Sequence, residues 1–153
     1  MKKTILQTAA VLLILAGMTV SCGKEEKPIE IPFTEYSLTE TFWQWSNLGY
    51  DGKVIVINSN AELENYITCT EGTFPEIDFS NNTLLIACGA STWNVGSINT
   101  IILKHSTTEY ELKVTIFMGN ATVVERWHIA IIIPKISRIT EINLRTDYVQ
   151  LNF

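Results

Sequence analysis

Alternation of apolar and polar residues predicts strands over most of the chain after residue 50. Residues 109–118 carry an apolar side chain at every second position from Tyr110 to Met118, with mostly polar side chains between them. A period of two is that of a strand with one face in a core. Residues 54–57 are a continuous apolar run, and residues 83–88 and 98–103 carry apolar side chains on both faces, patterns typical of strands buried on both sides.

Turn residues separate these strands from the rest of the chain. Gly119 and Asn120 predict a tight hairpin that returns residues 123–133 antiparallel to the alternating strand. Pro134 ends that strand because proline lacks the N–H donor of a ladder. Two more short strands are predicted at 136–144 and 148–153.

One helix is predicted among the strands. Ser59 and Glu62 form a capping box, because the serine hydroxyl can accept from the glutamate amide while the carboxylate reaches back. Leu63, Tyr66 and Ile67 give a narrow apolar stripe over two to three turns, and the helix should end near Cys69 to Gly72. The predicted fold class is α+β: a mostly antiparallel β sheet or half-closed barrel, with one short helix near the N-terminal side of the domain.

The first residues are typical of an export signal. Lys2 and Lys3 precede an apolar run shorter than a membrane span, and Cys22 follows a stretch of small residues. This arrangement is similar to that of bacterial lipoproteins, with a signal peptide at 1–21 and a lipid on Cys22 that attaches the chain to a membrane. The alternative is an ordinary signal-peptidase site near Ser21.

Residues 22–41 are polar, acidic and interrupted by two prolines, so we expect them to form a flexible tether after the lipidated cysteine. Residues 42–153 then make a single β-rich globular domain of ordinary size. The charged residues after Cys22 resemble the sorting signals of Gram-negative outer-membrane lipoproteins. We therefore expect the protein in the cell envelope, on the outer membrane, either facing the periplasm or exposed at the surface.

Charge and side-chain chemistry exclude several functions. The formal net charge is -5, and loss of the two signal-peptide lysines brings it near -7. Nucleic acid is therefore a poor partner, because binding it needs clustered cations. The two histidines, His105 and His128, lack the spacing of metal ligands and have no nucleophile beside them. We assign no catalytic residue, metal or cofactor, and we predict that the protein is not an enzyme.

Two cysteines remain in the predicted domain. In an oxidising compartment Cys69 and Cys88 can form a disulfide that closes a loop of about 20 residues, worth on the order of 3 kcal/mol. The alternative is two separate buried thiols, because Cys88 lies inside an apolar strand and cysteine packs well as a small apolar side chain.

The loop from Gly89 to Ser97 is the strongest candidate for a partner-binding site. It joins two predicted strands and displays Trp93 among small and polar residues. These neighbours are Ser91, Thr92, Asn94 and Gly96. An aromatic side chain among adaptable hydrogen-bonding groups is typical of binding loops on a rigid scaffold. The alternative is that Trp93 folds back as a lid over the mouth of a barrel.

Four segments together resemble a known family. They read Asn-Ser-Asn-Ala-Glu-Leu-Glu-Asn-Tyr at 58–66, Pro-Glu-Ile-Asp-Phe-Ser at 75–80, Leu-Leu-Ile-Ala-Cys-Gly at 84–89 and Gly-Ser-Ile-Asn-Thr-Ile at 96–101. A short helix, a Pro-x-Ile-Asp-Phe turn, an apolar strand ending in glycine and a glycine-led strand follow in the order of the PrcB-type protease-complex domain. The length, the export signal and the many strands are also similar to bacterial inhibitors of streptopain-type cysteine proteases.

This resemblance implies a protease as the protein partner, bound and inhibited by a loop that lies in the protease cleft. The implied contact is the loop 89–97, where Gly89 and Gly96 would allow close backbone approach. Asn120, at the predicted hairpin tip, would assist.

Two other functions stay open. The first is a glycan-binding accessory lipoprotein that stacks sugar rings on Trp43, Trp45 and Trp93. Trp43 and Trp45 share one face of an extended segment, where they can also act as a core plug. The second is a purely structural envelope protein, the expectation if the tryptophans are all buried.

Overall fold

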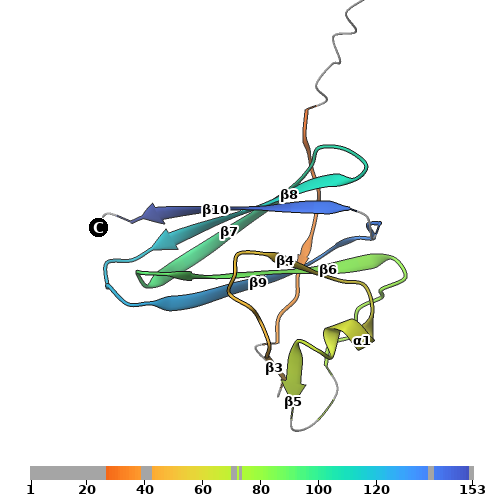
Figure 1. Ribbon diagram of the computed structural model, residues 1–153, viewed down its shortest axis with the longest axis horizontal. Coiled ribbons are helices and arrows are strands. Elements are labelled where there is room, and N and C mark those ends of the chain that lie inside the picture. Colours follow the sequence, from red (N-terminus) through yellow and green to blue (C-terminus); the bar gives the residue numbers. More distant parts are fainter. Residues whose placement is uncertain (1–26, 39–42, 70–71, 73, 138–139, 152–153) are drawn as a thin grey trace, which may run out of the picture.

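Two four-stranded β-sheets face each other across the main core (Figure 1). The computed structural model describes residues 27–38, 43–69, 72, 74–137 and 140–151. Sheet A has the order β1 (Ile29–Glu30), β7 (Val95–Lys104), β8 (Glu109–Met118) and β10 (Glu141–Gln150). Sheet B has the order β2 (Thr34–Glu35), β9 (Glu125–Pro134), β6 (Asn82–Ser91) and β4 (Val54–Ile57). The prediction of a mainly antiparallel β protein with one short helix is confirmed, although the sheets do not close into a barrel.

Alternate side chains from the two sheets form the core between them. In β8 the predicted inward residues from Tyr110 to Ile116 are buried, as the period of two requires. Leu85 and Ala87 of β6 and Ile131 of β9 belong to the same cluster. This arrangement is a β-sandwich, with its core formed by the inner faces of both sheets.

A second apolar layer covers the outer face of sheet B. Leu84 and Ile86 of β6 point away from the first core and pack with Ile57, Leu63 and Ile67. The covering elements are the helix α1 (Asn60–Leu63) and the two-stranded sheet of β3 (Trp43–Trp45) and β5 (Ile67–Cys69). Strand β6 is thus buried on both faces, as its continuous apolar run predicts.

The described part of the predicted tether belongs to the fold, which corrects the sequence prediction. β1 pairs with β7 in sheet A and β2 pairs with β9 in sheet B. The segment therefore passes from one sheet to the other along a shared edge (Figure 1). Tyr36 and Leu38 are buried in the second apolar layer. The prediction was wrong because it weighted the acids and prolines of this segment above its alternating apolar residues.

Helix α1 is shorter than predicted. The Glu62 amide donates to the Ser59 hydroxyl at 3.2 Å, as a capping box requires, while the Glu62 carboxylate accepts from the Asn58 amide at 2.6 Å. The helix ends at Leu63, and the Asn65 side chain donates to the carbonyl of Ala61 at 3.0 Å. The residues after it form β5, because β3 offers them a pairing partner.

The predicted hairpin at Gly119 and Asn120 is absent from the structure. β8 pairs with β7 and β10, and β9 pairs with β6 and β2, so the chain crosses between the sheets at 119–124. Neither Gly119 nor Asn120 has a positive φ angle. The two predicted C-terminal strands are also replaced by one strand, β10, which runs parallel to β8.

The burial of residues 36–38 makes a prediction for stability. Substitution Leu38→Ala should lower the free energy of unfolding by about 2–5 kcal/mol, because it opens a cavity in the second apolar layer. Ile29→Ala is the matched control, because Ile29 is 64% exposed and its truncation should cost less than about 0.5 kcal/mol. Urea denaturation of both variants measures the difference, and equally small losses would support a tether instead.

Candidate functional site

Two connections between the sheets meet at one end of the sandwich. β6 ends at Ser91 and β7 begins at Val95, so the first connection is only residues 92–94. The predicted loop of 89–97 is therefore too long, because both of its flanks belong to strands. The second connection is 119–124, between β8 and β9. We refer to residues 92–94 and 119–124 together as the loop end.

Asn94 ties the two connections to each other. Its main chain donates to the carbonyl of Ala121 at 2.9 Å and accepts from the Gly119 amide at 2.8 Å. Its side-chain oxygen accepts from the Ala121 amide, also at 2.9 Å. A Cβ on Gly119 would lie 2.5 Å from the side-chain amide nitrogen of Asn94, so only glycine allows this approach. The hydrogen bonds fix the position of one connection relative to the other.

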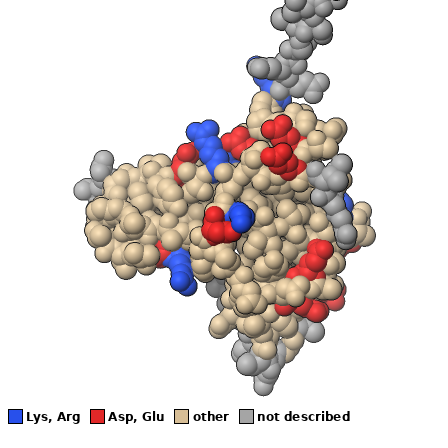
Figure 2. Space-filling model, viewed as in Figure 1, with Lys and Arg blue, Asp and Glu red and all other residues tan. Residues whose placement is uncertain are grey.

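The loop end exposes apolar side chains. Val124 is 74% exposed and Val123 is 49% exposed, and Trp93 beside them is half-buried. No residue of 92–94 or 119–124 carries a charge. In Figure 2 the corresponding end of the molecule, at the left, is free of charged side chains on the viewed face. The surface is therefore a small apolar patch on a fixed support, with the Glu125 carboxylate at its edge, where it accepts from the Val95 amide at 2.8 Å.

The structure brings together some of the predicted binding residues and separates others. Thr92, Trp93, Asn94 and Asn120 all belong to the loop end. Ser91 is buried, and its hydroxyl accepts from the Trp93 amide at 3.1 Å. Gly96 lies in β7, at the irregularity in its pairing with β8. Gly89 is buried in β6 under Trp127, where an added Cβ would lie 2.6 Å from the indole.

Gly89 and Ser91 are therefore not available at the surface, which corrects their assignment as contact residues. Gly89 does allow a close approach, but to an indole of its own chain. Sequence reasoning missed Val123 and Val124 because it placed them in a strand returning from a hairpin. Two adjacent valines after a polar Asn-Ala-Thr segment were the available signal.

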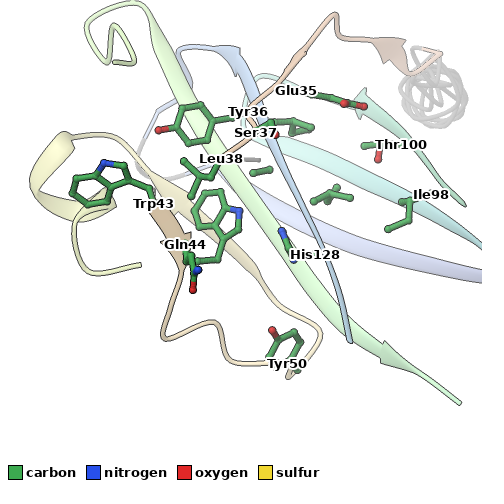
Figure 3. Close-up of a pocket in the computed structure, with 14 residues that line it drawn as sticks. Glu35, Tyr36, Ser37, Leu38, Trp43, Gln44, Tyr50, Ile98, Thr100 and His128 are labelled. Carbon is green, nitrogen blue, oxygen red and sulfur yellow. The ribbon is translucent and has the colours of Figure 1, made fainter. Parts of the chain in front are cut away.

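A pocket of about 660 Å³ lies along the edges of β7 and β9 (Figure 3). Ile98 and Thr100 line it from sheet A, and residues 128–131 line it from sheet B. The segments 35–38 and 43–45, together with Tyr50, complete the lining. The pocket lies where β1 and β2 do not cover the β7 and β9 edges, because each of them pairs with only two residues of its neighbour.

Aromatic side chains form the outer wall of this pocket. Trp45 packs edge-on against Tyr36 and His128, with ring centroids 6.0 Å apart in each pair. Trp43 packs in the same way on Phe74 at 5.1 Å. At the far side, the Arg126 guanidinium lies 4.8 Å from the centre of the Tyr50 ring, a cation–π contact.

Desolvation affects two ionisable groups in the pocket. Burial raises the pKa of Tyr36 to about 12, and its hydroxyl donates to the Pro75 carbonyl at 2.9 Å. Desolvation lowers the pKa of His128 below its ordinary value of 6.5, because the imidazole packs against Trp45. His128 is therefore neutral at pH 7 and offers no charge to a ligand.

The two cysteines of the domain are not joined, so the disulfide alternative is wrong for this structure. Cys88 is buried in β6, and its thiol donates to the Gly49 carbonyl at 3.1 Å. Burial, with a smaller effect of Asp51, raises the pKa of the Cys88 thiol. Cys69 lies half-buried opposite Trp43. The reading as two separate thiols is the one that the structure supports.

Within the residues that the structure describes, His, Cys, Asp and Glu side chains do not gather in groups of three or more that could hold a metal ion. The described helix is too short and too polar to cross a bilayer. Cys22 lies outside the described residues, so its lipidation stays a prediction.

Comparisons with protein-family models, curated proteins and solved structures found no match to this chain. The resemblance to the PrcB-type domain and to inhibitors of streptopain-type proteases therefore stays a prediction.

Close packing at Gly89 makes a first prediction. Gly89→Ala should destabilise the protein by about 1–3 kcal/mol, because the new methyl group collides with the Trp127 indole in a packed core. Gly49→Ala is the control, since its Cβ would meet nothing closer than 3.8 Å. Thermal or urea unfolding of the two variants should separate them, and equal stabilities would contradict the packing described here.

The lowered pKa of His128 makes a second prediction. The unfolded chain takes up the His128 proton at a higher pH than the folded protein, so protonation favours unfolding. Stability should fall as the pH decreases through 6.5 toward the lower folded pKa. His128→Gln should remove this part of the pH dependence. Urea denaturation between pH 7.5 and 5.5 tests it, and identical pH profiles would show that desolvation of His128 is negligible.

Proposed function

We propose that this protein is a non-enzymatic lipoprotein of the cell envelope that binds a protein partner through the loop end. The proposed partner is a cysteine protease, which the loop end inhibits by occluding its cleft. A lipid on Cys22 holds the protein to the membrane of a Gram-negative cell. The protease and the lipid rest on the sequence resemblance, and the location of the contact rests on the geometry of the loop end.

The single observation that carries the proposal is the link between the two connections through Asn94. Hydrogen bonds at 2.8 and 2.9 Å join residues 94, 119 and 121 before any partner is present. Ordering of loops is one of the main costs of association, and a surface that is already ordered avoids it. The loop end is therefore prepared to bind without rearrangement.

The chemistry of the loop end also supports a protein partner. Binding hot spots are commonly aromatic side chains at the centre of a patch, with neighbours that exclude water. Trp93 of the first connection supplies the aromatic group, and Val123 and Val124 of the second connection supply exposed apolar side chains. Charged residues are depleted at interface cores, and the loop end has none.

Glycan binding on a platform of three tryptophans has less support. The ring contacts of Trp43 and Trp45 are with Phe74, Tyr36 and His128. Both tryptophans line the pocket, whereas Trp93 belongs to the loop end. The three indoles therefore belong to two different parts of the surface.

Residual activity of papain and a streptopain-type protease, titrated with the full chain, tests the proposal. The wild-type protein should inhibit stoichiometrically. Trp93→Ala and Val124→Asp should each weaken inhibition by about 30-fold, because hot-spot truncations cost about 2 kcal/mol or more. Val56→Asp is the matched control on β4, since Val56 is 37% exposed, and it should inhibit like the wild type.

Two results would contradict this function. The absence of inhibition at micromolar excess would remove these proteases as partners. Equal inhibition by the wild type, Trp93→Ala and Val124→Asp would show that the loop end is not the contact.

A further inference from the structure

The edge of β9 is only partly paired. Antiparallel strands alternate, so every second residue points both its N–H and its C=O to the same neighbour. The carbonyl of Ala130 faces the segment that follows β2 and accepts from the Tyr36 amide at 2.9 Å. By the same alternation, His128 and Arg126 direct their main-chain groups to this edge. β2 ends at Glu35, and Tyr36 makes the last bond to this edge; among the described residues, no other main chain is paired with His128 or Arg126 on that side.

The facing edge of β7 is open over the corresponding length. Ile102 accepts from the Ile31 amide at 2.9 Å, so the even-numbered residues Ile98 and Thr100 also point their main-chain groups outward. β1 reaches only Leu103 and Lys104 in its ladder. Two strand edges, one from each sheet, thus line the same pocket without a pairing partner among the described residues.

We propose that this pocket takes an extended segment of a partner protein, added as a strand to the β9 edge. The segment would lie antiparallel to β9, beyond the bond between Tyr36 and Ala130, and would pair with the main chains of His128 and Arg126. Strand addition is a general way in which an exposed sheet edge recognises a peptide. The proposal concerns a different surface from the loop end and does not depend on protease inhibition.

The pocket specifies the side chains of the added strand. Residues opposite Ile129 and Trp127 would point between the sheets, where Ile98 provides an apolar contact, so they should be apolar. The residue opposite His128 would point outward, beside the Trp45 ring. An aliphatic or aromatic side chain fits both positions.

Charges near the two ends of the β9 edge specify the end residues of the segment. Antiparallel pairing places its C-terminal half near Arg126 and its N-terminal half near Glu35, both of which are exposed. An acidic residue toward the C-terminus and a basic one toward the N-terminus complement these charges. The predicted occupant is an extended segment with alternating apolar residues, basic at its start and acidic at its end.

Fluorescence anisotropy with synthetic octapeptides tests the proposal on the full chain. The probe pool alternates apolar and polar residues, begins with lysine and ends with aspartate. Affinity selection against the protein should enrich members of this pool over a pool with reversed charges. N-methylation of the amides that face β9 should weaken binding of an enriched peptide at least tenfold, while N-methylation of the alternate amides should not.

Two variants at His128 distinguish the contribution of its main chain to peptide binding from that of its side chain. His128→Pro removes the outward N–H without breaking a bond to β6 and should weaken binding about tenfold. His128→Ala keeps that donor and should stay within about threefold of the wild type. Thr100→Trp, which fills the pocket from the opposite strand, is a second way to block it and does not depend on tolerance of proline.

The proposal is overturned if no peptide is enriched, or if the methylation pattern has no effect. It is equally overturned if His128→Pro and Thr100→Trp bind the peptide like the wild type. Loss of peptide binding in Val124→Asp alone would assign the peptide to the loop end and also reject the pocket as its site.

Discussion

The burial of β6 on both faces is the constraint on which the rest of the structure depends. Its residues from Thr83 to Gly89 are buried, and alternate side chains face two different layers. Sheet A covers one face, and α1 with the β3–β5 pair covers the other. A strand of this kind cannot remain in water, because both of its apolar faces need a cover. The segment 29–38, Trp43 and Trp45 are therefore held where they can border the pocket.

The surfaces open to partners are the places where this covering ends. β1 and β2 are short, so among the described residues part of the β7 and β9 edges has no pairing partner. The loop end forms where the chain crosses between the sheets. There the main chain of Asn94 bonds to Gly119 and Ala121 of the other connection instead of to a neighbouring strand. Both surfaces present main-chain groups or exposed apolar side chains. Such groups are used in the recognition of protein chains.

Sequence reasoning predicted the strands well and their pairing poorly. Alternation in 109–118 and the apolar run at 83–88 are local signals, and both strands lie where expected. Pairing depends on distant residues, so Gly119 and Asn120 suggested a hairpin although the chain crosses between the sheets there. Of the candidate site, Trp93, Asn94 and Asn120 were identified, while Val123, Val124 and the open edge of β9 were not. An unpaired edge has no sequence signature, because it depends on where β2 stops.

Residue-resolved hydrogen exchange of the main-chain amides tests most directly whether these edges are open. The amides of Trp127 and Ile129 face β6 and should exchange slowly, whereas those of Arg126 and His128 should exchange quickly. An alternating fast and slow pattern from Arg126 to Ile129 is the result predicted here. Slow exchange at Arg126 and His128 would contradict the account, because it would mean that another part of the chain already occupies the edge.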